Sequence, residues 1–201
     1  MKKLMMIAVM AVCCLTANAQ KARHDAGSFT LQPMVGLSTG TWRGERNIDG
    51  ISTTSTSNEA RVGFTIGAEA EYYTSTNWLS LSAGVMYQQQ GWKFKENSKS
   101  TNIDYINIPV LVNFYVAKGF ALKVGLQPGF KVNASYDGKE IEKIKSFNFA
   151  IPLGLSYEFK NGITLDLRGA GSLTRVDDYD DDNKWYTDGG MLTIGYKFEL
   201  K

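Results

Sequence analysis

The chain has 201 residues, enough for one domain, and its composition excludes several protein classes. The 22 lysines and arginines nearly balance the 20 aspartates and glutamates, so a nucleic-acid partner, which needs a basic surface, is not expected. Both cysteines, Cys13 and Cys14, lie in the first segment, so the rest of the chain has no disulfide framework.

The first segment is predicted to be a secretory signal peptide, residues 1–19. Lys2 and Lys3 give it a positive start, and residues 4–15 form an apolar run that is too short to span a membrane as a helix. Ala17-Asn18-Ala19 then supplies the small residues of a cleavage site, so the mature chain should begin at Gln20 with a short N-terminal segment, 20–28.

Eight later stretches alternate apolar and polar residues with period two, which predicts β-strands. In chain order they cover residues 29–38, 61–72, 79–89, 106–116, 120–132, 147–159, 163–171 and 192–200. Long polar connections (40–59, 92–103, 135–146 and 174–187) alternate with short ones (73–77, 117–119 and 160–162), and the last short one holds an Asn-Gly hairpin signal. This alternation is typical of an outer-membrane barrel.

Alternation alone does not decide which face points inward, because a soluble lipocalin-like barrel alternates with its apolar face inside. Three features favour the membrane form. The apolar face carries no charged residue on any strand, and the polar face is rich in glycine, which suits the narrow lumen of an eight-stranded barrel. Aromatic residues gather at strand ends, as in membrane girdles: Trp42, Tyr72, Trp78, Trp92, Tyr105, Tyr115, Tyr157, Trp185 and Phe198.

The predicted fold is therefore an all-β, eight-stranded antiparallel up-and-down transmembrane β-barrel over residues 29–201, with an apolar lipid face and a polar lumen. The expected location is the cell outer membrane, with the long loops extracellular and both termini periplasmic. Ten charged residues should face the lumen and form an ion-pair network, since unpaired charges there would be costly. They are Arg61, Glu69, Glu71, Lys123, Lys131, Glu158, Asp166, Arg168, Lys197 and Glu199.

Several motifs resemble the PorT-like outer-membrane β-barrel family. Tyr105-Ile106-Asn107-Ile108-Pro109-Val110-Leu111 is similar to that family's Tyr-x-x-Ile-Pro-Leu-Leu pattern, and Gly125-Leu126-Gln127-Pro128-Gly129-Phe130 is similar as well. The segment from Tyr157 to Gly162 and the closing Gly195-Tyr196-Lys197-Phe198 extend the resemblance over nearly the whole chain after the signal peptide. The resemblance implies the fold and the outer-membrane location, and it implies no single activity and no catalytic residues.

The sequence predicts no enzyme and no cofactor. The only histidine, His24, precedes the first strand and is expected to lie outside the barrel, so a histidine-based hydrolase is disfavoured. The acidic stretch 177–183 could hold Ca²⁺ through Asp178, Asp180 and Asp182, although its spacing is not that of an EF-hand and a solvated acidic loop is favoured.

The leading functional hypothesis is a structural or interaction barrel whose extracellular loops meet an envelope or extracellular protein. A small porin or transporter for small solutes is the first alternative, and a soluble lipocalin-like binder is the second. Outer-membrane lipid and the barrel-assembly machinery are expected partners in either membrane case.

Overall fold

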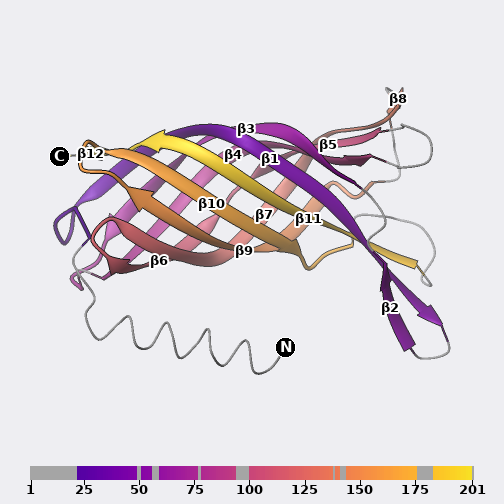
Figure 1. Cartoon of the computed structure of the whole chain (residues 1–201), viewed down its shortest axis with the longest axis horizontal. Coiled ribbons are helices and arrows are strands. Elements are labelled where there is room, and N and C mark those ends of the chain that lie inside the picture. The colour runs from indigo at the N-terminus through magenta and orange to yellow at the C-terminus, as the bar shows by residue number, and fades with distance from the viewer. Residues whose placement is uncertain are drawn as a thin grey trace.

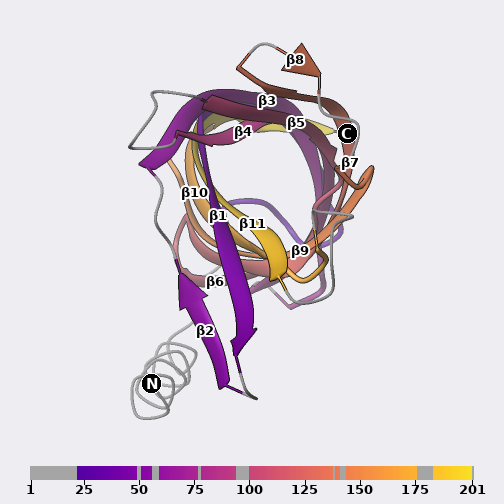
Figure 2. The ribbon, with the colours of Figure 1, turned by 90° about the vertical axis from the view of Figure 1, so that its right-hand side faces the viewer.

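The strands of the protein form one continuous antiparallel sheet that closes on itself (Figures 1 and 2). The computed structural model describes residues 22–48, 51–55, 59–76, 78–93, 100–137, 139–140, 144–175 and 183–200. Its strands are β1 (Phe29–Ile48), β2 (Ile51–Ser55), β3 (Glu59–Tyr73), β4 (Leu79–Lys93), β5 (Ser100–Asn107), β6 (Val110–Ala117), β7 (Phe120–Tyr136), β8 (Lys139–Glu140), β9 (Phe147–Glu158), β10 (Ile163–Ser172), β11 (Asn183–Tyr196) and β12 (Phe198–Leu200). In these described segments, no helix is long and apolar enough to cross a membrane.

The sheet is a closed eight-stranded barrel, as predicted. Closure is made by β1, which pairs with β3 on one side and with β11 and β12 on the other. Two of the barrel strands are interrupted. Pro109 separates β5 from β6 because proline has no N–H for the ladder, and Lys197 separates β11 from β12.

The predicted long connections are shorter in the structure, because strand pairing continues well past the last apolar residue. β1 runs to Ile48 and stays in register with β11 as far as the pair Arg46 and Asn183. Most of the segment predicted as the loop 40–59 is therefore strand. The apolar alternation ends where lipid contact ends, whereas backbone hydrogen bonds do not require apolar side chains. At the other end the turns are tight, and Gly119 and Gly162 adopt positive φ angles of 82° and 85°, which glycine tolerates.

The two faces of the barrel are those of a membrane protein, with apolar side chains outside and polar ones inside. Large apolar residues along the outer wall are exposed, up to 67% for Leu153, and the most buried residues include glutamate, lysine and asparagine. A soluble lipocalin-like barrel would need the opposite arrangement, so that alternative is wrong.

The predicted aromatic girdle needs two corrections. Tyr105 and Tyr115 are only 1% and 2% exposed and face the lumen, because they alternate with outward-facing Ile106 and Phe114 on β5 and β6. The side chains of Trp42 and Trp92 lie outside the described residues. Tyr72, Trp78, Tyr157 and Phe198 are exposed on the outer wall. Trp185 is exposed too, but it has the strand parity of the inward-facing Thr187 and Met191, so its place in the girdle is a second correction.

Candidate functional site

A ring of four charged side chains crosses the lumen. Glu69 of β3 accepts hydrogen bonds from Lys123 of β7 (Nζ to Oε1, 2.7 Å) and from Arg168 of β10 (Nη2 to Oε2, 2.6 Å). Asp166 of β10 completes the ring, since its Oδ1 lies 2.6 Å from Arg168 Nε and its Oδ2 lies 2.9 Å from Lys123 Nζ. All four side chains are at most 2% exposed. The ring ties strands on opposite parts of the wall together.

Strand alternation and glycine explain how the ring fits in a narrow lumen. Asp166 and Arg168 are two residues apart on β10, so both point inward. Opposite Arg168 on β9 stands Gly154, where an added Cβ would lie 2.7 Å from Arg168 Cγ. The glycine thus leaves room for the arginine stem. Two carboxylates and two cations balance, so no net charge is buried here.

A second cluster lies towards the short-turn end, around Glu71 of β3. Lys197 Nζ lies 2.6 Å from Glu71 Oε2 and also donates to the hydroxyls of Tyr73 and Tyr115 at 3.0 and 3.1 Å. Tyr115 donates to Glu71 Oε1 at 2.6 Å, and Ser80 and Asn113 donate to the same oxygen. Sequence reasoning missed the polar and aromatic members of this cluster, although their parity on β3, β4 and β6 places them inside.

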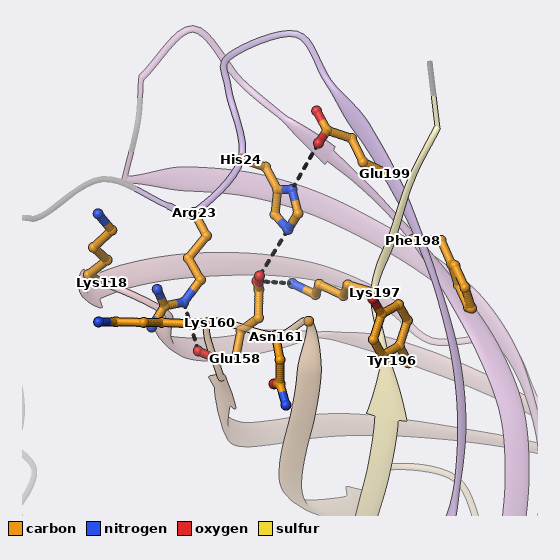
Figure 3. A pocket seen from close by; sticks show the side chains of 11 residues that line it. Arg23, His24, Lys118, Glu158, Lys160, Asn161, Tyr196, Lys197, Phe198 and Glu199 are labelled. Carbon is orange, nitrogen blue, oxygen red and sulfur yellow. Dashed lines mark hydrogen bonds and ion pairs between the residues drawn. The ribbon is translucent and has the colours of Figure 1, made fainter.

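The N-terminal segment is docked into the short-turn mouth of the barrel (Figure 3). His24 Nε2 lies 3.0 Å from Glu158 Oε1, and its ring packs on Tyr73 at a centroid distance of 5.0 Å. Arg23 Nε donates to the carbonyl oxygen of Glu158 at 2.8 Å, and Ala22 is buried next to Tyr73. The expectation that His24 lies outside the barrel is therefore wrong. Its segment lacks any periodic pattern, so only the tertiary contacts reveal its place.

This mouth contains a cavity of about 690 Å³. Its lining is strongly polar, and Figure 3 shows Lys118 and Lys160 on the same side as Arg23, with Tyr196 and Phe198 on the other side. The cations face a space that is open to solvent.

Three of the ten predicted lumen charges lie apart from the two clusters. Glu199 is about half exposed, 3.9 Å from His24 Nδ1. Lys131 Nζ donates to the carbonyl of Ile144 at 2.7 Å. Arg61 is half-buried and pairs in register with Gly40, towards the long-loop end. The predicted single network is thus two clusters, built from the other seven charges, and Glu158 joins the second cluster through Lys197 Nζ, which lies 3.5 Å from its Oε2.

The calcium candidates Asp178, Asp180 and Asp182 lie outside the described residues. Among the residues that the structure does describe, no group of three or more His, Cys, Asp or Glu side chains could hold a metal ion.

The long-loop end carries a second feature, a cleft of about 650 Å³ between β9, β10 and β11. Lys145 and Arg175 line it together with Phe147, Leu173 and Tyr186. Next to it, the Arg43 guanidinium lies over the Tyr186 ring at 5.1 Å. The cleft therefore combines cationic and aromatic groups, as interaction surfaces do.

Comparison with known proteins agrees with this architecture. The family model described as outer membrane protein beta-barrel domain matches residues 18–178. Among solved structures, Neisserial surface protein A is 15% identical with a TM-score of 0.50, covering 85% of this chain and 97% of that one. The attachment invasion locus protein Ail of Yersinia pestis is 17% identical with a TM-score of 0.48, covering 86% and 99%. OprG of Pseudomonas aeruginosa is 17% identical with a TM-score of 0.44, covering 87% and 97%.

At these identities the likeness to Neisserial surface protein A speaks for the fold alone. A comparison with curated proteins gave no match. The family match spans most of the chain, and it agrees with the apolar outer wall and the closed sheet. The chain therefore belongs to the outer membrane protein beta-barrel domain family and is an outer-membrane β-barrel protein.

Proposed function

We propose that the protein is a closed scaffold that acts through the surface of its long-loop end and not by passing solutes through its lumen. The observation that carries this proposal is the buried ring of Glu69, Lys123, Asp166 and Arg168, which joins β3, β7 and β10 across the interior. An eight-stranded barrel is barely wide enough for its own side chains, and here those side chains are bonded to one another.

The docked N-terminal segment supports the same reading. His24 and Arg23 hold the segment against Glu158 in the short-turn mouth, below the cluster around Glu71. A solute on a straight path would have to displace the segment and then two ionic clusters. Each displacement would leave charges unpaired in a region with little water.

The length of the strands supports the proposal that the long-loop end is the interaction surface. β1 has 20 residues and β7 has 17, whereas a tilted strand needs about 9–11 residues to span a membrane. The surplus extends the sheet beyond the lipid, and β2 adds a further strand to β1 there (Figure 1). This projection and the cleft at Tyr186 form the proposed interaction surface for an extracellular or envelope partner.

The proposal includes the orientation and processing of the chain. The long-loop end faces outside the cell, both termini are periplasmic, and residues 1–19 are removed as a signal peptide. Assembly then depends on the barrel-assembly machinery. The PorT-like resemblance of the segment 105–111 fits this proposal. The only histidine is engaged at the short-turn mouth, so the proposed role is non-enzymatic.

Single-channel recording in planar lipid bilayers tests the closed lumen. The unmodified protein should give no steady current steps. A variant with all four ring residues changed to alanine serves as the comparison, because it removes the ring, the first of these barriers, without leaving an unpaired charge there. Folding of both proteins is checked by their heat-modifiable migration in gels. Steady steps from the unmodified barrel, as large as those of the variant, would replace the scaffold with a small pore.

A further inference from the structure

The methionines of this chain have an unusual distribution. Seven are present, and four of them, Met1, Met5, Met6 and Met10, lie in the predicted signal peptide. The other three come from distant parts of the sequence, on β1, β4 and β11. All three meet in a single buried cluster in the lumen: Met34, Met86 and Met191.

The strand register brings these residues together. Met34 of β1 lies opposite Gly67 of β3, and Gly67 lies opposite Met86 of β4. A Cβ added at Gly67 would lie 2.9 Å from Met86 Cγ, so the absence of a side chain there opens space between the two methionines. Met191 of β11 lies opposite Ser38 of β1 and completes the group from the other side.

Simple filling of a gap does not explain this cluster well. The surrounding lumen is polar, with Ser38, Gln88 and Thr193 all buried. Thr193 Oγ1 donates a hydrogen bond to Met34 Sδ at 3.7 Å, so this sulfur points towards a polar residue of the lumen and acts as an acceptor. A leucine would fill the same volume with less loss of side-chain entropy. Three flexible thioethers are useful where the sulfur atoms are needed.

We propose that Met34, Met86 and Met191 form a three-thioether binding site for a soft monovalent metal ion, Cu(I) or Ag(I). Thioether sulfur is a soft ligand that selects Cu(I) over hard cations. The three ligands are neutral and the neighbouring ionic ring has no net charge, so the bound ion adds one positive charge. Hard divalent ions such as Ca²⁺ would find no carboxylate here, since Glu69 and Asp166 are both committed to the ring.

The long-loop end offers the approach to the site. Met191 is the most exposed of the three at 7%, against 3% for Met34 and 2% for Met86. Gly189 and Gly190 precede it on β11 towards that end, and the buried Gln90 side chain lies against Gly189. An ion that enters from this end therefore has to displace the Gln90 amide. This proposal does not depend on the proposed function, because metal binding in the lumen neither requires nor prevents the binding of a partner at the long-loop end.

Silver nitrate titration tests the site, because Ag(I) needs no reductant. The protein is extracted from outer membranes into detergent micelles after labelling of the methionine methyl groups with ¹³C. One equivalent of Ag(I) should shift the three methyl resonances together, and native mass spectrometry should show one ion per chain. Calcium chloride at the same concentration should shift none of them.

Variants assign the ligands. Met34→Leu, Met86→Leu and Met191→Leu nearly conserve volume, so the barrel should still fold, and each should weaken Ag(I) binding at least tenfold. Ile103→Leu, in the separate buried cluster with Tyr105 and Ala134, is the matched control and should leave the affinity unchanged. Unshifted methyl resonances in the unmodified, folded protein would overturn the proposal without any variant. Full affinity in a folded leucine variant would overturn it as well.

Discussion

Removal of Arg168 should destabilise the barrel far more than removal of an arginine outside the two clusters. In Arg168→Ala, Glu69 and Asp166 lose the guanidinium that binds both at 2.6 Å, and Lys123 alone remains to balance two carboxylates. One buried negative charge is left uncompensated. Breaking a buried ion pair in this way costs about 3–5 kcal/mol of the free energy of unfolding.

Arg43→Ala is the matched control, because it makes the same chemical change on the same barrel. Its side chain is 34% exposed, against 2% for Arg168, and it lies 3.7 Å from Asp188. A pair this open contributes only about 0–1 kcal/mol. The double variant Arg168→Ala/Asp166→Ala restores the charge balance between Glu69 and Lys123, so it should recover part of the loss.

The measurement is urea unfolding of the barrel in lipid vesicles, followed by tryptophan fluorescence. The expected order of stability is unmodified protein, Arg43→Ala, the double variant, and finally Arg168→Ala. Arg168→Ala within about 1 kcal/mol of Arg43→Ala would refute the reasoning, since the ring would then be screened by water. A double variant less stable than the single one would show that lost packing outweighs charge balance.

Three further predictions can be tested separately, the first from the sequence and the other two from the structure. N-terminal sequencing of the protein from outer-membrane fractions should begin at Gln20, and an uncleaved Met1 would contradict the signal peptide. Leu153→Lys places a charge at mid-strand on the outer wall, so it should lower the free energy of folding in lipid vesicles by about 2–4 kcal/mol. Thr76→Lys, in an exposed turn, is the control and should cost little. Equal refolding yields for the two variants would show that the face assigned to lipid is not in contact with it. Gly154→Ala should lower the urea midpoint, because its Cβ would lie 2.7 Å from both Arg168 Cγ and the Leu167 carbonyl oxygen. An unchanged midpoint would show that β9 and β10 separate there without loss of stability.

The sequence by itself determined the fold class and the two faces of the wall. Period-two alternation is a local property of each strand, and the cost of charge in lipid keeps the outer positions apolar on every strand. The inward direction of Glu69, Asp166 and Arg168 follows directly from that parity. The parity of Tyr105 and Tyr115 also places them inside, so their prediction as girdle residues is wrong. A position near a strand end does not by itself direct a side chain towards the lipid.

Only the tertiary structure decided which inward side chains meet. The shear of a closed barrel sets the height of each strand relative to the others, and no local pattern encodes that offset. It separates the predicted single charge network into two clusters and brings three distant methionines into one. It also decides that the segment with His24, which has no periodicity of its own, docks against Glu158 at the short-turn mouth.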